Sequence, residues 1–215
     1  MKATLAPSLL LVATLLRPSP ARAASPAEHM LAGAQAFREE RYPEALVEFR
    51  AAEKTGPGDP GATWYVAAAL VKLNRAEDAL TAFARAEDLA PGERDGLFDY
   101  YHALACYDAR LYTCADRLLA ALGADPAPKI AAQARQIRRD LAPLLSAAPA
   151  PAAIDWYHTQ AQAALVAGRA TLAAAYFDEA AALAALRSDG HRRGEAQAGA
   201  ARARRAAAAT ERRRP

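Results

Sequence analysis

The sequence predicts an all-α protein built from antiparallel helical hairpins. The first observation is composition: 62 of the 215 residues are Ala, the best helix former and a poor strand former. The second is a repeat of 34 residues, which puts Ala, Phe and Pro at matching places in two successive segments. The third is that apolar residues within a segment recur at i, i+4 and i+7, which is the spacing of one helix face.

Residues 1–23 have the pattern of a signal peptide. Lys2 provides a positive start, residues 3–16 carry no charge and are mostly apolar, and Ala21-Arg22-Ala23 matches a small-x-small cleavage site. The apolar stretch is too short to cross a bilayer comfortably. We therefore expect a periplasmic or secreted protein with no transmembrane segment after cleavage. A lipid anchor is not expected, because no cysteine lies near the cleavage site. Retention of residues 1–23 as an uncleaved membrane anchor is the alternative.

Two segments, residues 26–59 and 60–93, match at five positions. Small residues at two of these positions let the two helices of a hairpin approach closely, and the aromatic residue fills the space between adjacent hairpins. A proline then ends the second helix because it cannot continue the hydrogen-bond ladder. The matched pairs are Gly33 and Ala67, Ala45 and Ala79, Phe49 and Phe83, Ala52 and Ala86, and Pro57 and Pro91.

A third segment, residues 96–129, continues the pattern after a slip of two residues. Ala115 takes the place of Ala79, and Ala103 is the small residue of the first helix. Leu119 replaces the aromatic residue, so this segment departs most from the repeat.

The pattern resembles the tetratricopeptide repeat, a 34-residue helix-turn-helix unit, over residues 26–187. The resemblance implies a right-handed superhelix of hairpins whose first helices line a concave groove. Proteins of this family bind peptides or partner helices in that groove, so the resemblance also implies a protein-protein interaction scaffold.

A capping helix is expected to complete a domain spanning residues 26–142. One stripe of this helix is apolar and would cover the exposed face of the third hairpin, and Pro143 is expected to end it. Residues 143–153 then read as a semi-rigid Pro/Ala linker. The apolar stripe consists of Ile130, Ala134, Ile137 and Leu141.

Residues 154–187 predict a fourth hairpin, with Ala161, Ala173 and Phe177 at the repeat positions. Residues 188–215 are rich in Ala and Arg, and no residue larger than Ala lies on an apolar stripe before residue 210. We expect this basic tail to be a solvated helix that frays at its end. Residues 187–215 carry a net charge of +6, whereas residues 24–186 carry −6.

The groove positions implied by the resemblance give a set of partner-binding candidates. Arg38 and Lys72 fall at equivalent positions of two units, among several aromatic residues. Asp108 takes the corresponding place in the third unit, so the carboxylate clamp known in this family is incomplete. The alternative is that the aromatic residues only pack between helices. The candidates are Met30, Phe37, Arg38, Trp64, Val71, Lys72, Tyr100, Leu104 and Tyr107.

No motif in the chain calls for an enzyme, a cofactor or a metal. The four histidines show no metal-ligand spacing, and no serine lies in a nucleophile elbow. The predicted function is a non-catalytic interaction scaffold of the bacterial cell envelope with a protein or peptide partner. Two alternatives stay open, binding of an anionic envelope surface by the Arg-rich tail and binding of a small ligand in the aromatic groove. Nucleic acid is an improbable partner because residues 187–215 hold no aromatic side chain for base stacking.

Cys106 and Cys114 are the two cysteines of the chain, on either side of the turn in the third hairpin. In an oxidising compartment two such thiols tend to pair, so we expect an intramolecular disulfide. Two buried, reduced thiols are the alternative. A metal site is disfavoured because further ligands are not expected nearby.

Overall fold

The computed structural model describes residues 24–122, 127–146 and 150–212, and it confirms the all-α prediction. Over these ranges the chain forms ten α-helices and no β-strand. None of these helices is both long enough and apolar enough to span a membrane. The signal-peptide prediction for residues 1–23 concerns a segment outside these ranges. The helices are α1 (Pro26–Arg38), α2 (Tyr42–Thr55), α3 (Pro60–Lys72), α4 (Ala76–Leu89), α5 (Gly96–Asp108), α6 (Tyr112–Ala121), α7 (Pro128–Ser146), α8 (Pro151–Val166), α9 (Ala170–Leu186) and α10 (Gly190–Glu211).

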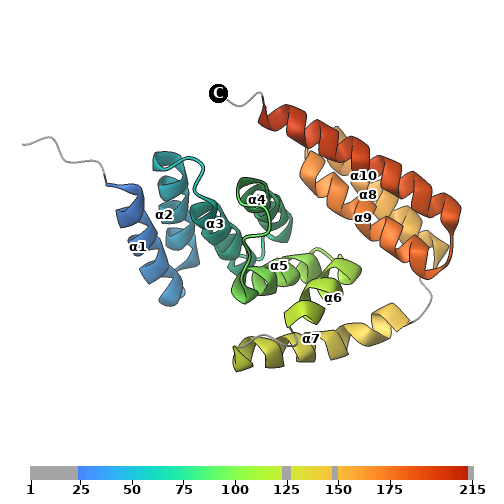
Figure 1. The fold of residues 1–215 in the computed structure, drawn as a ribbon, viewed down its shortest axis with the longest axis horizontal. Helices are drawn as coiled ribbons and strands as arrows, with labels where there is room; N and C mark the ends of the chain where they lie inside the picture. The colour runs from blue at the N-terminus through green and yellow to red at the C-terminus, as the bar shows by residue number, and fades with distance from the viewer. Residues whose placement is uncertain (1–23, 123–126, 147–149, 213–215) are drawn as a thin grey trace, which may run out of the picture.

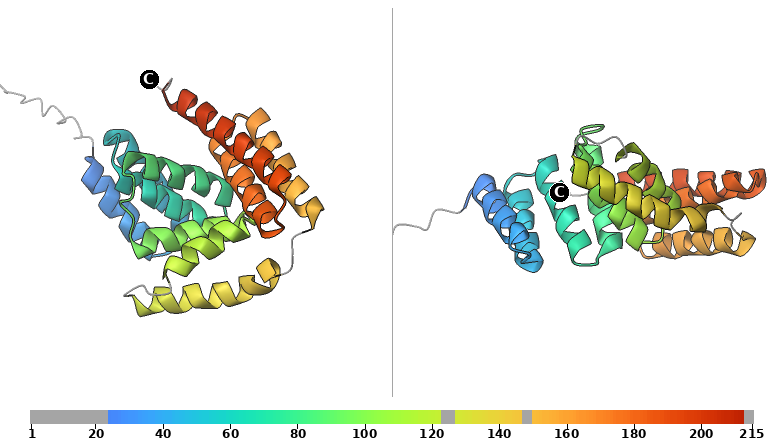
Figure 2. Two further views of the ribbon diagram at one scale, coloured as in Figure 1. Left: turned by 45° about the vertical axis from the view of Figure 1, so that its right-hand side comes forward. Right: turned by 90° about the horizontal axis from the view of Figure 1, so that it is seen from below.

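Consecutive helices pack as antiparallel hairpins, and the hairpins lie side by side. Figure 1 shows the pairs α1–α2, α3–α4 and α5–α6 following one another along the molecule, with α7 beneath the third pair. Helices α8, α9 and α10 form a three-helix bundle at the other end (Figure 2). The bundle contacts the hairpins through α9, which packs against α4 and α6.

Steric fit explains why small and aromatic residues recur in the repeat. A Cβ atom added to Gly33 of α1 would lie 2.6 Å from the ring of Phe49 in α2, so this position has no room for a side chain. Phe49 in turn stacks on Tyr65 of the next hairpin at a centroid distance of 5.0 Å. Phe83 contacts Phe98 of the third hairpin in the corresponding way, but edge to face, at a centroid distance of 5.2 Å. Each aromatic residue therefore joins its own hairpin to the following one.

The hairpin turns share one backbone conformation. In each turn a single residue is left-handed, and it lies five positions before the small residue of the second helix. Only one of the four is a glycine, although this conformation is strained for other residue types. The turn between α9 and α10 has the same feature at Ser188, with φ of 58°. The residues of the four earlier turns are Glu40, Asn74, Arg110 and Gly168, with φ of 60°, 56°, 64° and 73°.

The structure corrects two expectations about the C-terminal half. Helix α7 does not end at Pro143 but continues to Ser146 with the proline inside it, so part of the expected linker is helical. The expected solvated tail is instead α10, which packs along α9 and buries Ala196, Ala200 and Ala203. A stripe of alanines is enough to pack α10 against α9, because small side chains let two helices approach closely. Because α10 carries no larger apolar residues on this stripe, the sequence pattern did not predict the contact.

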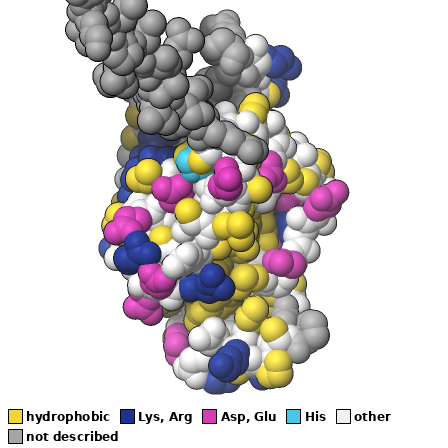
Figure 3. Space-filling view, turned by 90° about the vertical axis from the view of Figure 1, so that its left-hand side faces the viewer, with side chains coloured by type: hydrophobic (Ala, Val, Ile, Leu, Met, Phe, Trp, Pro, Cys, Tyr) yellow, Lys and Arg dark blue, Asp and Glu magenta, His cyan; other side chains and the backbone are white. Residues whose placement is uncertain are grey.

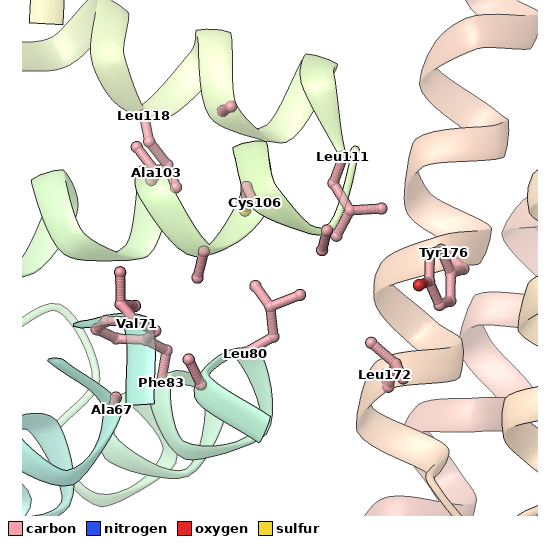
Figure 4. Packing of buried hydrophobic residues seen from close by; sticks show 14 of the residues in the cluster. Ala67, Val71, Leu80, Phe83, Ala103, Cys106, Leu111, Leu118, Leu172 and Tyr176 are labelled. Carbon is pink, nitrogen blue, oxygen red and sulfur yellow. The ribbon is translucent and has the colours of Figure 1, made fainter. Parts of the chain in front are cut away.

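Polar side chains reinforce the contact between the hairpins and the bundle. Glu179 of α9 is buried and accepts hydrogen bonds from the backbone N–H and hydroxyl of Thr113 and from the backbone N–H of Cys114, at the start of α6. The hydroxyl of Tyr157 donates to the carbonyl oxygen of Arg110. Figure 4 shows the apolar part of this contact, where Leu172 of α9 lies toward the hairpin core.

Candidate functional site

An aromatic cluster surrounds Lys72 where α1, α3 and α5 come together with the start of α2. The ammonium nitrogen of Lys72 lies 5.7 Å from the ring centroid of Tyr42 and 5.8 Å from that of Tyr101. Phe37 and Trp64 pack against Tyr101 at centroid distances of 6.1 and 6.3 Å. We call these five residues the Lys72 cluster.

Helix order brings the Lys72 cluster together. Phe37 and Lys72 occupy the last turns of α1 and α3, and Tyr42 opens α2 directly after the first turn. Tyr101 lies in the middle of α5, which packs beside α3. Stacking of successive hairpins therefore places the ends of two first helices against the middle of the third.

Lys72 is exposed, and none of the carboxylates in the described part of the chain lies within ion-pair distance of it. Its positive charge is flanked by two tyrosine faces, a cation–π arrangement. Burial raises the pKa of Tyr101 above its ordinary value, so this phenol stays neutral at physiological pH. The cluster therefore presents a cation on an aromatic surface.

The predicted partner-binding residues divide between surface and core. Arg38 is exposed, and Phe37, Trp64 and Tyr100 are half-buried. Met30 and Leu104 are half-buried too, and all five half-buried residues pack against the core.

Two of the predicted partner contacts need revision. Val71 is buried, with 6% of its surface exposed, and points into the core (Figure 4), so its prediction as a partner contact is wrong. It precedes Lys72 by one position, and adjacent residues of a helix point to different sides. Tyr107 is 39% exposed, but its ring packs against Tyr112 at 6.0 Å rather than in the Lys72 cluster.

Tyr42 and Tyr101 were not among the residues predicted from the sequence. Tyr42 belongs to a second helix, whereas the groove positions were taken only from first helices. Tyr101 follows the predicted Tyr100 by one residue, and its ring contacts Phe37 and Trp64. The adjacent tyrosines in the sequence were the available signal, but only the helix rotation decides which one faces Lys72.

A polar pocket lies between the hairpins and the C-terminal bundle. Its volume is about 490 Å³, and Trp156 stands on its wall with 41% of its surface exposed. Arg169, the residue directly before α9, reaches α4, where its guanidinium lies 2.6 Å from the carboxylate of Glu77. Tyr176 donates its hydroxyl to the same carboxylate at 3.1 Å. These contacts span about a hundred residues of sequence, so no local pattern predicts the pocket.

A shallow hollow of about 350 Å³ lies between α1 and α2 at the outer end of the array. Leu31 and Val47 are 73% and 66% exposed on these two helices. Figure 3 shows this end of the molecule, where hydrophobic side chains lie between acidic and basic ones. The first hairpin therefore leaves apolar side chains exposed on its outer side.

The predicted disulfide is present between Cys106 and Cys114, whose Cα atoms lie 6.0 Å apart. It joins the end of α5 to the start of α6 and so links the two helices of the third hairpin. The expectation that no further ligand lies near these cysteines is wrong. One nitrogen of His102 and the two sulfur atoms all lie within 4.8 Å of one another.

His102 is held in a largely apolar setting. Its ring stacks on Phe83 at a centroid distance of 4.8 Å. Its Nδ1 atom is buried and has no hydrogen-bond partner among the residues that the structure describes. Desolvation, with smaller contributions from the positive charges of Arg117 and Arg94, lowers the pKa of His102 to about 4. The imidazole is therefore neutral at physiological pH.

Comparison with known protein families and curated proteins found no match. The described residues form an all-helical protein whose sequential antiparallel hairpin contacts are consistent with a helical repeat array.

Proposed function

We propose that the protein is a non-catalytic interaction scaffold of the tetratricopeptide type that binds a peptide or partner helix at the Lys72 cluster. The 34-residue spacing, the antiparallel hairpins and the shared turn conformation support the repeat type. The observation that carries the functional proposal is Lys72 itself, an exposed cation between two tyrosine rings with no carboxylate partner in the described chain.

The chemistry of the Lys72 cluster favours a partner that carries both a carboxylate and an apolar side chain. An acidic side chain or a C-terminal carboxylate would pair with the ammonium group, and the surrounding rings would exclude water and strengthen that pairing. Aromatic and apolar contacts at the centre of an interface supply most of its binding energy. Arg38 is exposed at the equivalent place in α1 and would contribute a second positive charge.

We place this activity in the bacterial cell envelope. The signal-peptide pattern of residues 1–23 supports export, and the disulfide is consistent with an oxidising compartment.

A peptide-display selection against the folded, oxidised chain tests the proposal. Enriched peptides are expected to share a carboxylate next to an apolar residue. Hydrogen exchange of the complex should show protection in α1, α3 and α5 and little change in α8. Enrichment of peptides without a carboxylate, or protection confined to the C-terminal bundle, would contradict the proposal.

A further inference from the structure

A Cys₂His cluster lies inside the third hairpin, apart from the Lys72 cluster. His102 and Cys106 are one turn apart on α5, and Cys114 stands in the first turn of α6. The three donor atoms lie within 4.8 Å of one another, although they come from two helices. His102 and Cys106 share a helix face because they are four residues apart. The hairpin turn then brings Cys114 of α6 beside them as the third ligand.

A buried histidine with an unpaired nitrogen distinguishes this cluster from a plain structural disulfide. Cys106 is fully buried (Figure 4), and His102 carries a buried nitrogen without a hydrogen-bond partner in the described chain. Leaving a buried polar atom unpaired costs free energy. A metal ion is one partner that would satisfy it. Cys114 is partly exposed, so the disulfide is open to attack from one side.

We propose that reduction of the Cys106–Cys114 disulfide turns this cluster into a site for one monovalent copper ion, with two thiolates and one imidazole as ligands. Soft sulfur donors select Cu(I) or Zn²⁺ over hard cations. Structural Zn²⁺ requires four ligands, whereas Cu(I) is satisfied by three.

The surroundings favour copper over zinc. Among the described residues, no carboxylate belongs to the group of donor atoms that lie within 4.8 Å of one another. Glu179, which lies near Cys114, accepts hydrogen bonds at the start of α6. The positive charges of Arg94 and Arg117 act on His102. They favour the copper centre because two thiolates and Cu(I) carry a net charge of −1, whereas the same ligands with Zn²⁺ are neutral.

A dithiol is the reductant that opens the Cys106–Cys114 disulfide. Its thiolate attacks the sulfur of Cys114, releases Cys106 as a thiol, and the second thiol of the reductant then releases Cys114. The reductant becomes a disulfide, and the protein has gained two electrons and two protons. Cu(I) binding then displaces both thiol protons to solvent, and the copper keeps its oxidation state. In either state α5 and α6 remain linked, first by the disulfide and then by the ion.

The test is anaerobic titration of the dithiol-reduced, desalted protein with Cu(I) held by a coloured competing chelator. The reduced wild type is expected to withdraw one equivalent of Cu(I), and the oxidised protein and the double variant Cys106→Ser/Cys114→Ser none. His102→Gln should bind about tenfold more weakly or worse. His158→Gln is the matched control, because His158 also packs against a repeat phenylalanine, Phe177, at 5.0 Å. It should bind as the wild type does.

Reduced wild type that withdraws no more Cu(I) than the double serine variant would overturn the proposal. Equal affinity of His102→Gln and wild type would also overturn it, because the imidazole would then not be a ligand. Circular dichroism verifies that each variant is folded. If His102→Gln is unfolded, X-ray absorption of the loaded wild type decides: two sulfur donors and one nitrogen donor support the site, and sulfur donors alone refute it.

Discussion

Glu179 is the side chain that most clearly couples distant parts of the chain. Its carboxylate serves as the N-terminal cap of α6, which has no side-chain cap of its own. Burial raises the pKa of Glu179, and the hydrogen bonds from Thr113 and Cys114 oppose this shift. A buried carboxylate at a helix N-terminus is stabilised by the unpaired backbone N–H groups there.

Glu179→Gln is expected to destabilise the protein by about 1–3 kcal/mol. The amide nitrogen would face donors, so at least one of Thr113 and Cys114 would lose its acceptor. Urea unfolding measures the change. Asp178→Asn is the matched control, because Asp178 is the exposed neighbour on α9 and pairs with Arg204 at the surface. This substitution should change the free energy of unfolding by less than about 1 kcal/mol. Equal effects of the two variants would refute the capping role.

His102 predicts a pH dependence of stability. Its pKa of about 4 lies below the ordinary histidine value of 6.5. Between these values the unfolded chain binds a proton that the folded chain does not, so stability falls as the pH falls from about 6.5 to 4. The full loss would be about 3 kcal/mol.

Unfolding of oxidised wild type and His102→Gln across this pH range checks the prediction. Titration of Glu179 changes stability in the opposite direction, because burial raises its pKa and disfavours its charged form. Glu179 is present in both proteins, so its contribution cancels in the difference between their stabilities. His191→Gln is the control, since the His191 side chain is 82% exposed. A wild type whose stability follows the same pH curve as His102→Gln would contradict the account.

At the scale of elements, α10 depends on the absence of side chains. A Cβ atom at Gly199 would lie 2.6 Å from the ring of Phe177, whereas one at Gly194 would meet nothing within 4 Å. The two glycines occupy the same helix, so they separate close packing from helix propensity.

Gly194→Ala is expected to stabilise the protein by up to about 1 kcal/mol, the difference in helix propensity between the two residues. Gly199→Ala should lose this gain and destabilise α10 instead, because the new methyl group must displace the Phe177 ring. Thermal unfolding and limited proteolysis of α10 measure the outcome. Stabilisation by both substitutions would show that α10 does not pack closely on α9.

Much of the hairpin arrangement could be predicted from sequence, because small residues and aromatic residues alternate at a fixed spacing. Phe49 and Phe83 are fully buried, as the repeat required. Helix α10 could not be recognised in this way, since Ala196 and Ala200 provide close contact without hydrophobic bulk. The cap from Glu179 and the nitrogen of His102 depend on how helices rotate and pack, which the spacing does not specify.

The candidate site was predicted only in part for the same reason. The repeat positions identified Phe37, Trp64 and Lys72, which do lie together. They assigned Val71 to the groove and omitted Tyr42 and Tyr101, because one residue of helix rotation moves a side chain from the surface to the core. Aromatic contacts across three hairpins then determine what surrounds Lys72.

At the scale of the whole molecule, the hairpins and the bundle form one connected structure. Helix α9 contacts both α4 and α6, and charged side chains close the polar pocket between them. Trp64 and Lys72 are two turns apart on α3, so the Lys72 cluster lies along one side of that helix. The central claim is that this cluster, rather than the pocket or α10, is where a partner binds.

Titration calorimetry of a display-selected peptide with wild type, Lys72→Gln and Lys54→Gln tests this claim most directly. Lys54 is an exposed lysine on the second helix of the first hairpin, so it controls for loss of one positive charge. The account predicts that Lys72→Gln weakens binding about tenfold or more, equivalent to at least about 1.4 kcal/mol, and that Lys54→Gln leaves it unchanged. Equal affinity of Lys72→Gln and wild type would contradict the account.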